Sequence, residues 1–308
     1  MMIELASEPF LALASGVVAA GLIVHAVLVR RRAPAPVDAA EAVGTCRLML
    51  GLVRNMQQHR GMSSAWLAGD AGFGPRMDAR RRDITDLFVR LEQALESEYV
   101  RACPYPEQAA FEELRQQWQA LVDGLAQRSA EDSITRHSFL IATVLDWLSG
   151  YGEARLAPLV QGSGTAAGVR SYTHRLPAVT EALGQARAIG SSVAARKGCS
   201  PVARVRLLFL IARAEALVAQ STRDPAVAGE AAVRDRARHC VAEMARVVRA
   251  DMLMRAGVTV SADDYFALAT QTIDAVFAWI EACGGALLQA ETRAHPRAAP
   301  TSRLELGA

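Results

Sequence analysis

The sequence has few cysteines, and they form no pattern that would hold a fold together. Its five cysteines are an odd number, lie far apart and include no CxxC pair, and no histidines cluster with them. Neither a disulfide framework nor a zinc site is indicated, and a reducing compartment is the simpler interpretation. With 308 residues, the chain is long enough to bury a substantial core without cross-links. We expect no metal and no cofactor.

The sequence also lacks an excess of charge of either sign. Its 34 basic and 32 acidic residues give a net charge of +2, and they are spread evenly along the chain. Binding to a nucleic acid needs a concentrated basic face, so we expect no nucleic-acid partner. Lys197 is the only lysine, so arginine is this chain's default cation and a single arginine is weak functional evidence.

Aromatic residues are sparse at 6%, whereas alanine, leucine and arginine are abundant. This mixture favours helices over strands, and no stretch alternates polar and apolar residues as a half-buried strand would. The mean hydropathy of +0.13 lies far below that of a multi-span membrane protein and fits one spanning segment joined to a globular body.

One long uncharged run lies near the N-terminus. Residues 10–29 contain no Asp, Glu, Lys or Arg, and twenty helical residues reach about 30 Å, the thickness of a bilayer core. Glu4 and Glu8 precede the run and three arginines at 30–32 follow it, which is unlike a secretory signal. We therefore predict a single-pass helix in the inner (cytoplasmic) membrane, with the body in the cytoplasm by the positive-inside rule.

The rest of the sequence consists of amphipathic segments separated by Gly and Pro, each with one face to bury. We predict an all-α fold in which one N-terminal transmembrane helix is followed by about eight helices forming two four-helix bundles, divided at the loop 152–168. The predicted helices are 39–69, 77–101, 106–128, 131–151, 172–197, 201–221, 225–256 and 262–291. The predicted segments are a lead (1–9), the transmembrane helix (10–29), a basic and Pro-containing linker (30–38), the first bundle (39–151), a connection (152–171), the second bundle (172–292) and a disordered tail (293–308).

Two arginines lie on otherwise apolar helix stripes. Arg60 continues the stripe of Met56, and Arg187 continues the stripe of Leu183, each four residues on. The pattern therefore points two guanidinium groups toward the protein interior. Because the desolvation of a guanidinium is costly, each of them needs an anion and hydrogen-bond acceptors around it.

Two interpretations of these arginines stay open. In the first, each forms an internal salt bridge with a helix carboxylate, for which the candidates are Asp146, Glu181 and Asp274. In the second, Arg60 and Arg187 together hold a small planar oxyanion between the bundles, since guanidinium donors lie in one plane. The candidate supporting residues, which leave room or supply donors, are Gln57, His59, Gly61, Ser63, Ser64, Gly190 and Ser191.

Two segments resemble a known family. The sequence QQHRGMSSAWLAGD at 57–70 resembles the signature of the nitrate- and nitrite-sensing (NIT) domain family, whose first helix carries Q-x-E-R-G-x-S. The sequence SADDYFALATQTIDAVFAWIE at 261–281 resembles the family's last helix. The resemblance spans residues 40–292 and implies two four-helix bundles that bind nitrate or nitrite through arginines, here Arg60 and Arg187. His59 stands where the family usually has Glu; it either weakens the site or makes it pH-sensitive, or it is a surface residue.

Together these features predict a membrane-anchored sensor of nitrate or nitrite. The sequence contains no HExxH, GxSxG or P-loop motif, so no enzyme and no catalytic residues are expected. The residues after the eighth helix are too few for an output domain, so we expect a homodimer that signals to a separate protein. The alternative function is a membrane-anchored helical scaffold without a small-molecule ligand, in which both arginines would be paired internally with carboxylates.

Overall fold

The structure is a computed structural model that describes residues 37–101, 103–160, 165–223, 231–254 and 257–294. The predicted transmembrane helix at 10–29 and nearly all of the predicted tail at 293–308 lie outside these residues. Within the described part of the chain every regular element is helical and no strand occurs. The prediction of an all-α helical bundle is therefore confirmed.

The first group of helices follows the predicted segments closely. It consists of α2 (Ala39–Leu67), α3 (Gly74–Tyr99), α4 (Gln108–Asp123) and α5 (Ala130–Tyr151). Side-chain caps fix two of the starting points, because the Asp38 carboxylate accepts from the amide of Glu41 at 2.7 Å and the Ser129 hydroxyl accepts from the amide of Asp132 at 3.1 Å. In this group α2 packs against both α3 and α5.

The second group consists of α7 (Leu176–Ala195), α8 (Pro201–Thr222), α9 (Ala231–Val247) and α10 (Ala262–Ala294). Ser200 caps α8 through its hydroxyl, and Pro201 begins α8, where no backbone donor is lost. Helix α7 packs against α8 and α10, and α9 packs against α10.

The predicted loop at 152–168 is shorter than the sequence pattern suggests. Helix α5 continues into a wider π-type turn at Gly152–Leu156, and α6 (Thr165–Arg170) runs through a second such turn at Ser171–Arg175 into α7. Gly152 marks close packing, because a Cβ added there would lie 2.6 Å from the Thr173 side chain. Glycine here allows two helical segments to cross and does not end them.

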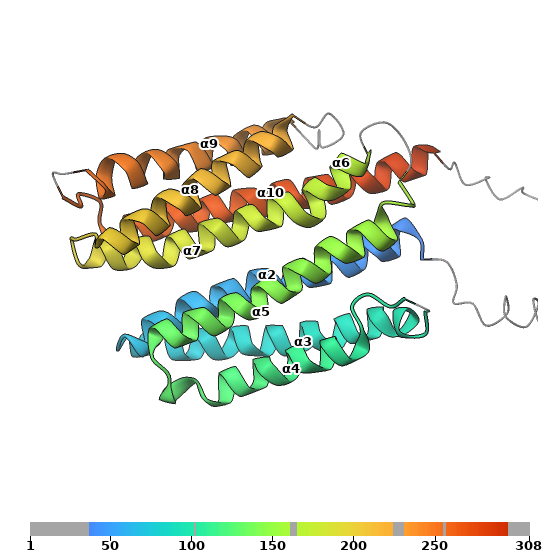
Figure 1. The fold of residues 1–308 in the computed structure, drawn as a ribbon, viewed down its shortest axis with the longest axis horizontal. Helices are drawn as coiled ribbons and strands as arrows, with labels where there is room; N and C mark the ends of the chain where they lie inside the picture. Colours follow the sequence, from blue (N-terminus) through green and yellow to red (C-terminus); the bar gives the residue numbers. More distant parts are fainter. Residues whose placement is uncertain (1–36, 102, 161–164, 224–230, 255–256, 295–308) are drawn as a thin grey trace, which may run out of the picture.

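The two groups of helices meet along α2 and α5 on one side and α7 and α10 on the other. Figure 1 shows these four helices in the middle of the molecule, with α3 and α4 along one edge and α8 and α9 along the other. Ion pairs join α2 to α10 at the rim of this contact, Arg54 to Asp274 at 2.8 Å and Arg47 to Glu281 at 3.1 Å. Side chains on the facing sides of α2, α5, α7 and α10 are thereby brought together.

One described helix meets the length and composition expected of a membrane span. It is α10, over Ala262–Thr292, with a mean hydropathy of 1.3. Half of its most apolar window is buried inside the protein, and core helices of soluble proteins meet the same criterion. The apolar character of α10 is therefore explained by its central position between α7 and α9.

Candidate functional site

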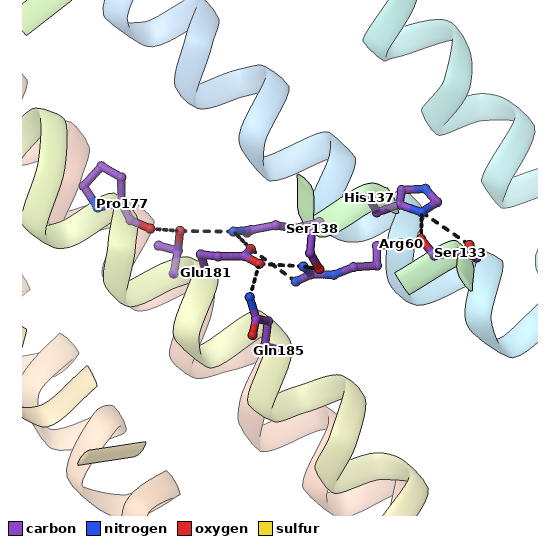
Figure 2. Close-up of polar contacts among 9 residues, drawn as sticks. Arg60, Ser133, His137, Ser138, Pro177, Glu181 and Gln185 are labelled. Atoms are coloured by element: carbon purple, nitrogen blue, oxygen red, sulfur yellow. Dashed lines mark hydrogen bonds and ion pairs between the residues drawn. The ribbon is translucent and has the colours of Figure 1, made fainter. Parts of the chain in front are cut away.

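Arg60 lies inside the contact between the two groups of helices. Helix α2 places its guanidinium against α7, and the side chain is only 1% exposed. Nη1 donates to Glu181 Oε1 at 2.6 Å and Nη2 donates to Glu181 Oε2 at 3.2 Å, so the two groups form a forked ion pair. Nη1 also donates to the Ser138 hydroxyl on α5 at 2.8 Å. Figure 2 shows the guanidinium reaching across from α2 to this carboxylate.

Glu181 is held in place from both sides of the contact. Gln57, one turn before Arg60 on α2, donates from its amide to Oε2 at 3.0 Å, and Gln185, one turn on along α7, donates to Oε1 at 2.8 Å. The Thr180 hydroxyl donates to the carbonyl of Pro177 at 2.8 Å. Both carboxylate oxygens thus accept two hydrogen bonds each, which fixes the position of Glu181 relative to Arg60.

Arg187 is buried next to this pair but has a different environment. Its residue exposure is 7%, its Nη1 donates to the Thr270 hydroxyl at 3.1 Å, and its guanidinium lies over the Phe266 ring at 5.1 Å from the centroid. Among the described residues no carboxylate forms an ion pair with it. Burial, together with the charge of Arg60, lowers the pKa of Arg187 to about 10. Arg187 is therefore a buried cation whose charge is not compensated by direct contact with an anion.

Two glycines let the arginines cross between the groups of helices. A Cβ added to Gly61 on α2 would lie 3.7 Å from Arg187 Nη2, and one added to Gly184 on α7 would lie 2.9 Å from Arg60 Nη2. Each guanidinium thus passes over a glycine of the opposite group. The sequence identified Gly61 as a residue that leaves room, whereas Gly184 was not among the candidate residues.

Ser64, Ser191 and Gly190 lie near the arginines in sequence, but none of them donates a hydrogen bond to the ion pair or leaves room beside it. Ser64 donates to the carbonyl of Arg60 at 2.9 Å, which is a bond within α2. Gly190 makes room for an aromatic ring and not for an anion, since an added Cβ would lie 2.3 Å from the Tyr265 ring. The hydroxyl oxygen of Ser191 is buried and has no hydrogen-bond partner among the described residues.

His59 is buried, so the interpretation of this histidine as a surface residue is wrong. It is 1% exposed and lies edge-on to Trp118, with ring centroids 4.9 Å apart. Its Nδ1 lies 2.8 Å from Nε2 of His137 on α5 and 3.1 Å from the Ser63 hydroxyl. Figure 2 shows His137 beyond Arg60, on the side away from Glu181. The position that usually carries Glu in the resembling family thus contributes here to the core of the first group of helices.

The protonation of this histidine pair follows from its contacts. Nδ1 of His137 lies 2.7 Å from the Ser133 carbonyl, which only accepts, so that nitrogen carries the proton and Nε2 is free to accept from Nδ1–H of His59. Burial, together with the proximity of His137, lowers the pKa of His59 to about 3, and burial lowers the pKa of His137 to about 4. Both rings are therefore neutral at physiological pH.

The structure selects one of the three carboxylates named as salt-bridge candidates. Glu181 pairs with Arg60, whereas Asp274 pairs with Arg54 at the rim of the contact. Asp146 lies elsewhere, where its backbone carbonyl accepts from the Tyr105 hydroxyl at 3.2 Å. The internal salt bridge is thus present for Arg60 only.

Sequence reasoning missed the side chains that contact Arg187. Thr270 and Phe266 belong to the closing segment at 261–281, which carried the resemblance but gave no role to individual residues. The available signal in that segment was the aromatic pair Tyr265 and Phe266 and the dipeptide Ala269–Thr270. Tyr265, the other member of the pair, donates its hydroxyl to the carbonyl of Ala186 at 2.9 Å and so holds α10 against α7.

Comparisons with known proteins gave two matches. The profile of the family described as nitrate and nitrite sensing (NIT) matches residues 51–285, a range that contains both arginines. The solved structure titled "Structure of the NasR transcription antiterminator" is similar, with a TM-score of 0.64 and 19% sequence identity over 83% of this chain and 70% of that chain. At this identity the similarity concerns the fold alone. No curated protein matches the sequence.

Proposed function

Because the chain belongs to the nitrate- and nitrite-sensing (NIT) domain family, we propose that it is a sensor in which Arg60 and Arg187 bind nitrate or nitrite between two four-helix bundles, α2–α5 and α7–α10. The family is a sensing module, and the proposed role is binding without catalysis. The observation that carries the proposal is the state of Arg187. It is a buried guanidinium beside a second guanidinium, and in the described structure it has no anionic partner.

A small planar anion would supply the negative charge and the hydrogen-bond acceptors that a buried guanidinium such as Arg187 requires. Desolvating a guanidinium costs several kcal/mol unless an anion compensates it, so a bound anion would relieve a cost that the protein already bears. Nitrate and nitrite present their oxygens in one plane, as the donors of a guanidinium require. Gly61 lies beside Nη2 of Arg187, since a Cβ added there would be 3.7 Å from that nitrogen, and the Thr270 hydroxyl already positions Nη1. Among the remaining predicted supporting residues, Gln57 has a contact with the site through Glu181.

Binding at this place would couple the two bundles. Arg60 comes from α2 and Arg187 from α7, and the contacts of Arg187 come from α10, so an anion held by both arginines favours the arrangement in which these three helices converge. We propose that this bias is the signal. It would pass from a homodimer, anchored in the inner membrane by residues 10–29, to a separate output protein.

One observation favours the alternative function, a helical scaffold. Arg60 is already paired internally with Glu181, as expected of an arginine that binds no ligand. Arg187 lacks such a pair among the described residues, and this difference distinguishes the two proposed functions. A scaffold has no reason to retain an uncompensated buried cation, whereas a sensor does.

Calorimetric titration of the full chain with nitrate, nitrite and chloride tests the proposal. A ceiling of about 1.5 kcal/mol per heavy atom gives four-atom nitrate a dissociation constant on the order of tens of micromolar. We expect saturable binding of nitrate or nitrite without binding of chloride, and its loss in Arg187→Gln and Arg60→Gln. Arg249→Gln is the matched control, because Arg249 pairs with Glu215 on the outer helices at 2.5 Å. Absence of binding by the folded wild-type protein would favour the scaffold.

A further inference from the structure

The charges around the two arginines do not balance. The guanidiniums of Arg60 and Arg187 carry two positive charges, and Glu181 is the only carboxylate within the described residues that forms an ion pair with either. Asp274 also acts on Arg187 through its charge, but it already pairs with Arg54 at 2.8 Å, and that pair is about half exposed. The buried cluster of Arg60, Glu181 and Arg187 therefore has a net charge of one positive unit.

Glu181 is positioned so that it remains in place when an anion enters. Its oxygens accept from two buried side chains, Arg60 and Gln57, and from the half-buried Gln185, and moving the carboxylate away would break all of these hydrogen bonds. Arg187 shares none of these bonds and has donors left after its contact with Thr270. An incoming anion can thus bind to Arg187 and to the remaining donor capacity of Arg60 without displacing the carboxylate.

A cluster with one net positive charge discriminates between anions by valence. A singly charged anion makes the buried cluster neutral, whereas a doubly charged anion leaves one negative charge buried and repelled by Glu181. The cost of burying an ion rises with the square of its charge, so the second charge is much more expensive to desolvate than the first. Shape does not provide this discrimination by itself, because guanidinium forks bind carboxylate, phosphate and other oxyanions alike.

We propose that Glu181 is a specificity-determining residue that sets the net charge of the cluster to one positive unit, and thereby admits singly charged planar oxyanions and excludes doubly charged ones such as sulfate. This inference rests on the proposed function, because it concerns the selectivity of the same site. It assigns Glu181 a role in the bound state, in addition to its pairing with Arg60 in the structure described here.

The test compares the affinities of nitrate and sulfate for the full chain and for Glu181→Gln by calorimetric titration at constant ionic strength. Glutamine keeps the length of the side chain and an oxygen for Arg60, while its neighbours Gln57 and Gln185 can turn their amides to suit it. We expect wild type to prefer nitrate over sulfate by at least about 100-fold, and Glu181→Gln to reduce this ratio at least about tenfold. If Glu181 has only a structural role, the substitution should lower the affinities for both anions together and leave the ratio of the two affinities unchanged.

Two further variants separate charge from structure. Glu181→Asp keeps the charge and should keep the wild-type preference for nitrate. Glu98→Gln removes a carboxylate from another buried ion pair, to Arg155 at 2.8 Å, and should also leave the ratio unchanged. If Glu181→Gln does not fold, Gln185→Lys adds a positive charge beside an intact Glu181 and should likewise admit sulfate, because Gln185 is only partly buried.

The outcomes distinguish this inference from the function on which it rests. Wild-type binding of nitrate together with an unchanged ratio in Glu181→Gln, or in Gln185→Lys where the first variant is unfolded, would overturn the role of Glu181 and leave the sensor intact. A wild-type protein that binds neither nitrate nor nitrite would overturn the proposed function, and the selectivity with it. Equal wild-type affinities for nitrate and sulfate would also refute the valence argument.

Discussion

Replacing Arg187 with methionine should stabilise the protein in the absence of nitrate and abolish its stabilisation by nitrate. Methionine has a flexible apolar side chain that can follow much of the path of arginine but carries no charge. In wild type, the buried charge of Arg187 has no anionic partner among the described residues and lowers the free energy of unfolding. The variant carries no such charge. The variant should therefore be more stable than wild type without nitrate, and wild type should be more stable than the variant when nitrate is added.

The magnitude follows from the environment of Arg187. Its pKa, lowered to about 10 by burial and then by Arg60, corresponds to about 3 kcal/mol of unfavourable free energy for the charged form in the folded state. The variant recovers this but loses the hydrogen bond to Thr270, worth about 1 kcal/mol, and the contact with the Phe266 ring, worth about 1 kcal/mol. A net gain of about 1 kcal/mol remains, which raises the melting temperature by about 2–4 °C in a domain of this size.

Thermal unfolding with and without nitrate, at constant ionic strength, measures both effects. If nitrate binds as proposed, a concentration of about 100 times its dissociation constant should stabilise wild type by about 2.7 kcal/mol, which exceeds the advantage of the variant. Arg249→Met is the control, since Arg249 is exposed and should neither stabilise the protein nor alter the response to nitrate. The reasoning is refuted if Arg187→Met is less stable than wild type without nitrate, or if nitrate stabilises both equally.

Two further predictions concern the surroundings of the site. Because burial lowers the pKa of His59 to about 3 and of His137 to about 4, the folded protein binds fewer protons than the unfolded chain once the pH falls below about 6.5. The free energy of unfolding should thus be highest near neutral pH and fall by roughly 2 kcal/mol per histidine by about pH 5. Urea unfolding should show this loss in wild type and little of it in the double variant His59→Leu and His137→Leu. Gly184→Ala should weaken nitrate binding and destabilise the fold by about 1–3 kcal/mol, because its Cβ would lie 2.9 Å from Nη2 of Arg60. Gly285→Ala, where a Cβ meets nothing within 4 Å, should be neutral or slightly stabilising, and equal effects in the two glycine variants would contradict the crowding argument.

The helices and the inward arginines could be predicted because they depend on local periodicity. Residues three and four apart share one face of a helix, so the stripes that contain Arg60 and Arg187 are visible in the sequence alone. Both side chains are buried in the structure, as the stripes indicate. The family resemblance added which anion to consider, and the NIT profile confirms that resemblance over residues 51–285.

The partners of these residues could not be predicted, because they depend on how helices far apart in the sequence are turned toward each other. Three carboxylates were candidate partners for the two arginines, and only the packing of α2 on α7 selects Glu181 for Arg60. His59 and His137 lie 78 residues apart, and no pattern in either helix indicates that they share a hydrogen bond. The loop at 152–168 was overestimated because glycine serves close helix packing as readily as a turn.

The unequal environments of the two arginines explain how one cluster can be both stable and responsive. A pair of uncompensated guanidiniums in the same contact would repel each other and open the interface between α2 and α7, whereas a pair fully matched by two carboxylates would leave nothing for an anion to bind. Glu181 compensates the charge of Arg60, and this ion pair stabilises the folded arrangement. The charge of Arg187 is not compensated by an ion pair among the described residues. If nitrate compensates that charge, its binding energy is added at the point where the two groups of helices meet, and the ligand can change how they pack without having to hold them together.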